Sequence, residues 1–374
     1  MTKTVLQSSL NLLRQDIQSM HAYAIQDSAG MVKLDAMENP YTLSADLQAK
    51  LGERLGKLAI NRYPGARIED LKTKLRTYAQ VPVGYGLMLG NGSDELISLL
   101  AMACDLPGAK VLAPLPGFVM YEMSAKFQGL QFIGVPLRAD FELDEPAMLA
   151  AIAQHKPAIT YIAYPNNPTG TLWDEGAIKN IIAACATYGG LVVMDEAYQP
   201  FSAKSWITQI HNAPEHNTNV LLMRTLSKFG LAGVRIGYMM GPAALVGEVD
   251  KLRPPYNISI LNCECALFAL EHEEVFRLQA IEIRAQRAML LEALAKIPGV
   301  QAMPSEANII LVRVQGKDSA NNGTAARVFA GMKAHKVLIK NVSNMHPLLA
   351  NCIRLSVGTP AENQQMLAAL QASI

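Results

Sequence analysis

The fold is decided around Leu191-Val192-Val193-Met194-Asp195, where four apolar residues run directly into a carboxylate. A continuous apolar run of this length predicts a strand that is buried on both faces, as in a parallel sheet covered by helices. Similar runs predict six further strands: Gly86–Leu89, Lys110–Ala113, Leu130–Val135, Ala158–Ala163, Val220–Met223 and Arg235–Met240. Seven such runs indicate one sheet.

Segments with helical periodicity separate several of these runs. The clearest are Asp94–Cys104, Gly117–Gln128 and Asp174–Tyr188. Strands connected by helices in this way favour a mostly parallel sheet with helices on both faces. The expected fold class is therefore α/β, with a large domain built on a mostly parallel seven-stranded sheet.

The pattern changes downstream of about Tyr256. Two long amphipathic helices are expected there, followed by short strands: Asn262–Leu270, Glu273–Ala295, Asn308–Val314 and Cys352–Val357. Consecutive prolines at 254 and 255 end a helix and fix the local backbone, so they are the natural hinge. We expect an N-terminal arm (residues 1–35), a large domain (36–255) and a smaller α+β C-terminal domain (256–374).

Composition excludes several classes of function. The 374 residues carry 33 basic and 32 acidic side chains, so no broad cationic face is expected for nucleic acid or an anionic membrane. Five cysteines without paired spacing predict reduced core thiols and no metal site. The sequence has neither a signal-peptide pattern nor an apolar run of about 20 residues. A soluble, cytoplasmic protein is expected.

Three polar residues fall just after predicted strands: Asn167, Asp195 and Lys228. Ligands of open α/β sheets bind beyond the carboxyl ends of the strands, so these side chains are expected at one location. A lysine amine can form a Schiff base with an aldehyde cofactor, and a buried aspartate can hold a protonated ring nitrogen. Taken alone, Lys228 could be a solvated surface charge, and Asp195 could be a helix cap.

Other segments suggest contacts for a phosphorylated ring. Asn167 and Tyr198 could hydrogen-bond a ring oxygen, although Asn166 to Gly170 could equally form only a tight turn. The N–H groups of Gly92, Ser93 and Asp94 could hold an anion at a helix N-terminus, although Ser93 could simply be an N-cap. Hydroxyl and guanidinium groups could close the other side of that anion site: Thr225, Ser227 and Arg235.

Three motifs together carry a family resemblance: Asn166-Asn167-Pro168-Thr169-Gly170, Asp195-Glu196-Ala197-Tyr198 and Ser227-Lys228. They resemble the fold type I aminotransferases that depend on pyridoxal 5'-phosphate (PLP). The flanking segments are more similar to the histidinol-phosphate aminotransferase family of histidine biosynthesis, and they extend the resemblance over nearly the whole chain: Lys33–Tyr41, Asn61–Gly65 and Cys352–Thr359.

The resemblance implies a role for each matching residue. Lys228, Asp195 and Tyr198 would be catalytic. The cofactor would be bound by Gly92, Ser93, Asp94, Phe118, Asn167, Asp195, Tyr198, Thr225, Ser227, Lys228 and Arg235. Phe118 would stack on the ring. Tyr63 would reach the phosphate in a neighbouring subunit's site, which implies a homodimer with shared active sites. The substrate would be bound by Tyr23, Asn167, Lys340 and Arg354.

Some positions depart from the family pattern. The spacing from Lys228 to Arg235 is one residue shorter than in many relatives, and Gly230 and Gly233 could absorb the difference. Phe118 stands where a tyrosine is common. Lys340 stands where an arginine is common, and its ammonium group supplies a positive charge but cannot form a bidentate contact with a phosphate. Met37 differs from the residue that is usual before Glu38 in this family, and the sequence indicates no consequence of the difference.

The implied reaction transfers an amino group from L-histidinol phosphate to 2-oxoglutarate, giving imidazole acetol phosphate and L-glutamate. Histidinol phosphate has no carboxylate, so its phosphate is the anionic handle, and Arg354 with Lys340 would supply two positive charges. Three alternatives stay open from the sequence: an aromatic amino acid aminotransferase, a threonine-phosphate decarboxylase, and a catalytically silent protein that retains the fold and binds PLP.

Overall fold

The computed structural model describes residues 5–20, 26–316 and 322–374. It divides into two compact units, residues 1–30 and 31–374. The first unit contains α1 (Val5–Leu10) and α2 (Gln15–Gln18). All other helices and strands described below belong to the second unit.

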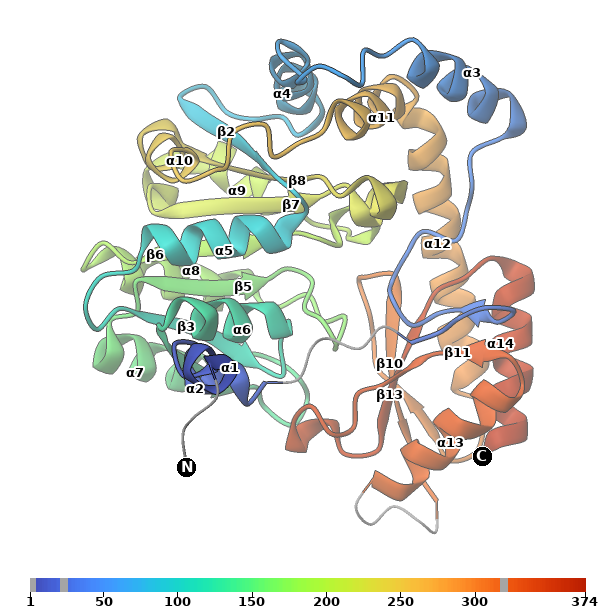
Figure 1. The fold of residues 1–374 in the computed structure, drawn as a ribbon. Helices are drawn as coiled ribbons and strands as arrows, with labels where there is room; N and C mark the ends of the chain where they lie inside the picture. The colour runs from blue at the N-terminus through green and yellow to red at the C-terminus, as the bar shows by residue number, and fades with distance from the viewer. Residues whose placement is uncertain (1–4, 21–25, 317–321) are drawn as a thin grey trace. The chain divides into compact units, whose positions relative to one another are not determined.

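A seven-stranded sheet is the centre of the second unit (Figure 1). Its spatial order is β2-β8-β7-β6-β5-β3-β4, and only β8 runs antiparallel to its neighbours. The strands are β2 (Tyr85–Gly90), β3 (Lys110–Leu115), β4 (Gln131–Pro136), β5 (Ile159–Ala163), β6 (Leu191–Asp195), β7 (Val220–Thr225) and β8 (Gly237–Pro242). The predicted mostly parallel α/β fold is confirmed. The last strand was placed too early, because Arg235 precedes β8 in a left-handed conformation with φ of 55°.

Helices cover both faces of this sheet because side chains alternate between the faces along each strand. Val193 packs into one apolar cluster and Val192 and Met194 pack into another. The first face is covered by α5 (Ser93–Ala103), α6 (Val119–Gln128) and α10 (Ala243–Asp250). The second is covered by α4 (Arg67–Tyr78), α7 (Glu145–His155), α8 (Glu175–Ala186), α9 (Ile207–Asn212) and α11 (Ile260–Glu271). The helices cover the faces of the sheet but not the carboxyl ends of its strands, where polar side chains can line a site.

A smaller antiparallel sheet lies in the C-terminal part of the chain (Figure 1). Its order is β12 (Lys340–Asn341), β13 (Cys352–Ser356), β10 (Ile309–Val314) and β9 (Val300–Ala302). A separate apolar cluster joins it to α12 (Glu273–Leu294), α13 (Gly323–Ala334) and α14 (Pro360–Ser373). A further parallel pair consists of β1 (Val32–Lys33) and β11 (Val337–Leu338). The domain boundary at 255/256 stays a prediction.

Short helical turns complete the connections between these elements. They are η1 (Gln199–Phe201), η2 (Pro214–Asn217), η3 (Ser227–Leu231), η4 (Ala232–Val234) and η6 (Pro347–Leu349). Within the described ranges, no helix combines the length and the apolar character needed to cross a membrane.

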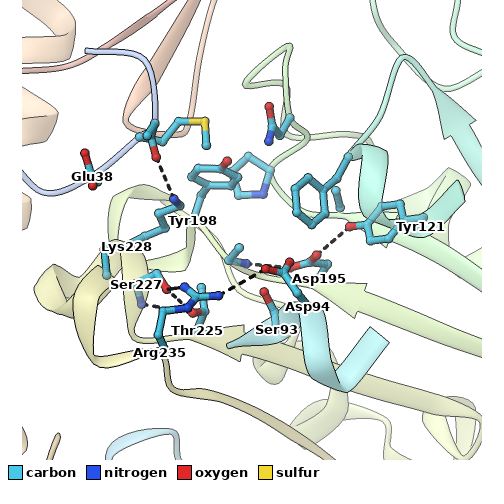
Figure 2. Close-up of a pocket in the computed structure, with 18 of the residues that line it drawn as sticks. Glu38, Ser93, Asp94, Tyr121, Asp195, Tyr198, Thr225, Ser227, Lys228 and Arg235 are labelled. Atoms are coloured by element: carbon cyan, nitrogen blue, oxygen red, sulfur yellow. Dashed lines mark hydrogen bonds and ion pairs between the residues drawn. The ribbon is translucent and has the colours of Figure 1, made fainter. Parts of the chain in front are cut away.

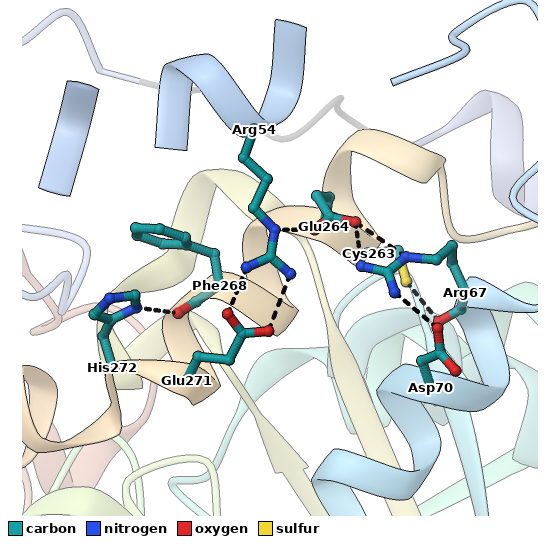
Figure 3. A network of polar contacts seen from close by, with 8 residues as sticks. All are labelled: Arg54, Arg67, Asp70, Cys263, Glu264, Phe268, Glu271 and His272. Atoms are coloured by element: carbon teal, nitrogen blue, oxygen red, sulfur yellow. Dashed lines mark hydrogen bonds and ion pairs between the residues drawn. The ribbon is translucent and has the colours of Figure 1, made fainter. Parts of the chain in front are cut away.

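A buried carboxylate fastens α3 (Ala45–Gly56) and α4 to α11 (Figure 3). The Glu264 side chain on α11 is only 3% exposed and forms ion pairs with Arg54 on α3 and Arg67 on α4. Arg54 also bonds to Glu271 at the end of α11, and Arg67 bonds to Asp70 in its own helix. The loop between α3 and α4 is therefore held at both ends by one buried acid.

Candidate active site

A cavity of about 360 Å³ opens at the carboxyl ends of β5, β6 and β7 (Figure 2). Because neighbouring parallel strands end at the same edge of the sheet, polar residues from distant parts of the sequence meet there. Ten of the residues predicted from the sequence line this cavity: Ser93, Asp94, Phe118, Asn167, Asp195, Tyr198, Thr225, Ser227, Lys228 and Arg235.

Lys228 lies in η3, directly after β7. Its Nζ donates a hydrogen bond to the carbonyl oxygen of Ala36 at 3.2 Å and lies 6.0 Å from the centre of the Tyr198 ring. Burial, and then the positive charge of Arg354, lower the pKa of the Lys228 amine to about 8. An unprotonated amine, which is the nucleophilic form, is therefore accessible near neutral pH.

Asp195 ends β6 with its side chain buried in the cavity wall. Its Oδ2 accepts a hydrogen bond from the Tyr121 hydroxyl at 2.6 Å, and its Oδ1 accepts one from the backbone N–H of Ala197 at 3.0 Å. Burial raises the pKa of the Asp195 carboxyl to about 6, and the Tyr121 hydrogen bond acts in the opposite direction. This carboxylate would gain from a cationic partner.

The hydroxyl and guanidinium groups that were predicted to hold an anion lie close together between β7 and α5. The Thr225 hydroxyl donates to Ser227 Oγ at 2.9 Å, and Arg235 donates from Nη1 to Ser227 Oγ and from Nη2 to Asp94 Oδ2, each at 3.3 Å. Arg235 reaches Ser227 despite the short spacing, and Gly230 has a φ of 142° in the turn between them.

Helix α5 lies opposite these hydroxyl and guanidinium groups. It begins at Ser93 without a side-chain cap at Gly92, and such a helix end keeps its first N–H groups available to an anion. Gly92 has a φ of 81°, and a Cβ there would lie 2.5 Å from Arg235 Nη2. Only glycine fits this position without moving the guanidinium group.

Arg354 and Asn167 are joined although 187 residues separate them in the sequence. Arg354 Nη1 donates to Asn167 Oδ1 at 2.7 Å, and Nη2 donates to the carbonyl oxygen of Asp35 at 2.8 Å. Arg354 lies on β13 directly opposite Lys340 on β12. Residues in register on antiparallel strands point to the same face of a sheet, so the two cationic side chains share a face.

Some predicted residues lie away from the cavity. Gly92, Lys340 and Arg354 do not line it, although Gly92 and Arg354 contact residues that do. Tyr63 is 74% exposed in the loop between α3 and α4, and its ring stacks on Tyr256 with 4.2 Å between the centroids. Tyr23 is outside the described residues.

The sequence reasoning missed several lining residues. Tyr121 is the most consequential because it bonds directly to Asp195. Its signal was its position three residues after Phe118, which is the N-cap residue of the helix that contains Tyr121. Ala36 and Glu38 also line the cavity. They belong to Lys33–Tyr41, a segment that the family resemblance identified without giving either residue a role.

These residues fit a phosphorylated, cationic ring that carries an aldehyde. In the described part of the chain, no lysine, arginine or histidine forms an ion pair with the buried Asp195. A protonated ring nitrogen would supply that missing charge. No group of three or more His, Cys, Asp or Glu residues among those described is arranged to hold a metal ion.

Solved structures with low sequence identity share this fold. A histidinol-phosphate aminotransferase from Clostridium acetobutylicum superimposes with a TM-score of 0.80 at 21% identity, and the match covers 91% of this chain and 98% of that one. A histidinol-phosphate aminotransferase from Sinorhizobium meliloti, solved in complex with pyridoxal-5'-phosphate, also gives a TM-score of 0.80, at 24% identity and 95% coverage of each chain.

Sequence comparisons identify the family. Residues 29–370 match the model of aminotransferase class I and II. A histidinol-phosphate aminotransferase of Polaromonas naphthalenivorans is 66% identical over 97% of this chain and 96% of its own length. One from Paracidovorax citrulli is 61% identical over the full length of both chains. The chain therefore belongs to the class I and II aminotransferase family, within which these similar relatives are histidinol-phosphate aminotransferases.

Proposed function

We propose that this chain is a PLP-dependent aminotransferase that transfers the amino group of L-histidinol phosphate to 2-oxoglutarate. The products are imidazole acetol phosphate and L-glutamate. One observation carries the proposal: a buried amine of lowered pKa, Lys228, and Asp195, a buried carboxylate without a cationic partner among the described residues, line one cavity together with Thr225, Ser227 and Arg235. The names of relatives at 61–66% identity support the choice of substrate.

Each lining residue has a role in this proposal. When bound, PLP supplies an aldehyde and a ring that accepts electrons. Lys228 would hold the cofactor through its aldehyde, and its free amine would move a proton to and from the carbon that carries the substrate amino group. Asp195 would keep a proton on the ring nitrogen. Asn167 and Tyr198 would hydrogen-bond the ring oxygen, and the Tyr198 phenol stays protonated because burial raises its pKa.

The phosphate of the cofactor would be held at the N-terminus of α5. Backbone N–H groups of Ser93 and Asp94 would bind it from one side, and Thr225, Ser227 and Arg235 from the other. Gly92 was also predicted to donate its N–H, but this group donates to the Gly90 carbonyl oxygen at 2.8 Å. Phe118 would cover the ring. Hydrogen bonds among Thr225, Ser227 and Arg235 already hold their donors close together, which supports this assignment.

The substrate phosphate would be bound by Arg354 and Lys340. Their shared sheet face puts two positive charges on one side of β12 and β13, and the bonds from Arg354 to Asn167 and to the Asp35 carbonyl fix the orientation of its guanidinium group. A dianionic phosphate is matched better by two cations than by one. Tyr23 belongs to this proposal as a further substrate contact, on the family resemblance alone.

We also propose a homodimer with shared active sites. Tyr63 of the partner subunit would reach the cofactor phosphate, and the 74% exposure of Tyr63 supports a role outside its own subunit. The exposed stack of Tyr63 on Tyr256 would then lie against the second copy.

Initial rates with added PLP and 2-oxoglutarate test the proposed function. L-histidinol phosphate is expected to be a much better donor than phenylalanine or tyrosine, and O-phosphothreonine is expected to release no carbon dioxide. A preference for an aromatic amino acid would contradict the assignment, as would decarboxylation of phosphothreonine. Binding of PLP without turnover of any donor would instead indicate a protein that retains only the fold.

A further inference from the structure

Tyr121 on α6 lines the cavity and is hydrogen-bonded through its side chain to Asp195 (Figure 2). Its hydroxyl donates to Asp195 Oδ2 at 2.6 Å, and its side chain is almost completely buried. The other oxygen of the carboxylate accepts from the backbone N–H of Ala197. Both donors are neutral, so they orient the carboxylate without cancelling its charge.

The Tyr121 ring is held on two sides. It stacks on Tyr161 with 4.2 Å between centroids and an angle of 5°, and it meets Phe118 edge to face at 5.5 Å. Aromatic contacts of this kind fix ring orientation and each contribute about 0.5–1.5 kcal/mol beyond their burial. One side chain therefore connects the carboxylate assigned to the ring nitrogen with the phenyl group assigned to the ring face.

The charged surroundings of Asp195 make a donor necessary. The carboxylates of Asp94 on α5 and of Glu196 both disfavour ionisation of Asp195, as does its burial. The phenols of Tyr161 and Tyr198 also lie close enough to interact with it. The Tyr121 hydroxyl and the Ala197 N–H act in the opposite sense. Tyr121 stays a donor because burial raises its own pKa well above the usual value.

We propose that Tyr121 is a positioning residue for the transamination: its hydroxyl aims the Asp195 carboxylate at the cofactor ring nitrogen and keeps it ionised. The inference rests on the proposed function and extends it to a residue outside the motifs. Loss of this hydroxyl leaves a buried carboxylate with a single neutral donor, which favours its protonated form. A protonated Asp195 cannot pair with a protonated ring nitrogen, so cofactor binding and the chemical step both weaken.

Tyr161 provides a matched control. It is a tyrosine in the same stack and is also buried, but its hydroxyl has no hydrogen-bond partner among the described residues. Replacing either tyrosine with phenylalanine removes one buried oxygen and keeps the stacked rings. Only Tyr121→Phe removes a bond to Asp195.

The experiment measures the dissociation constant of PLP for the apoprotein between pH 5 and 8.5. The wild-type apoprotein is expected to lose affinity as the pH falls through about 6, where Asp195 becomes protonated. Tyr121→Phe is expected to move this inflection upward by about one pH unit and to weaken binding about tenfold at neutral pH, since hydrogen bonds to charged groups are among the stronger ones. Tyr161→Phe is expected to follow the wild type. The PLP phosphate also titrates near pH 6, equally in all three proteins, so the comparison uses only the differences.

Two further measurements separate positioning from general loss of structure. Thermal unfolding of the apoproteins checks that both variants fold. In an Asp195→Asn background, Tyr121→Phe is expected to change PLP affinity little, because the carboxylate that it positions is already absent. With L-histidinol phosphate, Tyr121→Phe is expected to lower kcat more than it changes KM.

The possible outcomes are distinguishable. Wild-type protein that binds PLP, with Tyr121→Phe showing the same inflection and affinity, would overturn this inference and leave the proposed function standing. Equal shifts in Tyr121→Phe and Tyr161→Phe would also overturn it, because they would indicate a general packing effect. A wild-type protein that binds no PLP at any pH would overturn the proposed function and this inference with it.

Discussion

At Lys228, burial lowers the pKa of the side-chain amine before any ligand is bound. A solvated lysine stays protonated until about pH 10.5, whereas the buried amine has its pKa lowered to about 8. The change favours the free amine that covalent chemistry needs, and it costs stability wherever the charged form must be buried. Function and stability are therefore opposed at this residue.

That opposition predicts a pH-dependent effect of Lys228→Met in the apoprotein. Between pH 8 and 10.5 the unfolded chain keeps the lysine proton that the folded chain has released, so the free energy of unfolding contributed by Lys228 rises with pH. Below pH 8 the wild type carries the full cost of the buried charge, on the order of 3 kcal/mol. Urea unfolding should therefore show Lys228→Met more stable than wild type by a margin that shrinks from pH 7 to pH 10.5. A margin independent of pH would contradict the assignment.

Arg354 is expected to determine substrate capture without holding the cofactor. Arg354→Ala should raise the KM for L-histidinol phosphate about tenfold or more, because a charge-assisted phosphate contact is lost. Arg354→Lys should recover only part of this, since an ammonium cannot bond Asn167, the Asp35 carbonyl and a phosphate in the same geometry. Both variants should still bind PLP and show its visible absorbance. An unchanged KM in Arg354→Ala would remove this residue from the substrate site.

Single residues were predictable from the sequence where they follow strands. Asn167, Asp195 and Lys228 each fall just after an apolar run, and the topology of a parallel sheet brings such positions together. Tyr121 was not predictable in this way, because it lies inside a helix and faces Asp195 only through packing. The bond between Arg354 and Asn167 depends on how the small sheet meets the large one, which no local pattern encodes.

Among the elements, the three helices joined by Glu264 are held by a buried acid at their junction (Figure 3). A buried carboxylate is tolerated only when its partners replace the lost water, and here two guanidinium groups do so. The loop that carries Tyr63 begins after α3 and ends before α4. The network therefore fixes the ends of the segment proposed to contact a second copy.

Glu264→Gln is expected to lower the free energy of unfolding by about 1–3 kcal/mol, because two charge-assisted bonds become weaker ones in a buried place. Glu271→Gln is the matched control. It also removes a carboxylate bonded to Arg54, but the Glu271 side chain is 41% exposed, so less than about 1 kcal/mol is expected. Urea unfolding at one fixed protein concentration would measure both. Equal losses would show that the burial of Glu264 has no special effect.

Elements were predictable where a run of apolar residues was long enough to be recognised. All seven strands of the large sheet were found within about two residues at each end, and six of them are mostly buried, as continuous apolar runs predict; in the edge strand β4 only Val135 is buried. The two-residue strands β1, β11 and β12 were not found, since pairs of residues carry no periodic signal. The spatial order of the strands and the antiparallel direction of β8 also came only from the structure.

For the whole molecule, the proposal of shared active sites makes a prediction about mixed dimers. Lys228→Ala inactivates the site on its own subunit, and Tyr63→Ala weakens the site on the partner. In a dimer of one chain of each kind, both defects fall on the same site and the other site is intact. Co-expression of the two variants should therefore give clearly more activity than either variant alone.

Independent sites would give a different result in that experiment. If Tyr63 served only its own subunit, every site in the mixed dimer would contain one defect, and activity would stay at the level of the separate variants. Light scattering should give twice the chain mass of 40.6 kDa for each protein, which controls for loss of assembly. We propose residues 36–255 and 256–374 as the large and small domains of each subunit.

The most direct test of the account is to locate the covalent bond between this protein and PLP. Borohydride reduction of the PLP-loaded protein, followed by peptide mass mapping, should find the reduced pyridoxyl phosphate group on the peptide that contains Lys228 and nowhere else. The same treatment of Lys228→Ala should give an unlabelled protein. A label on another lysine, or no label on the wild type, would contradict the central claim.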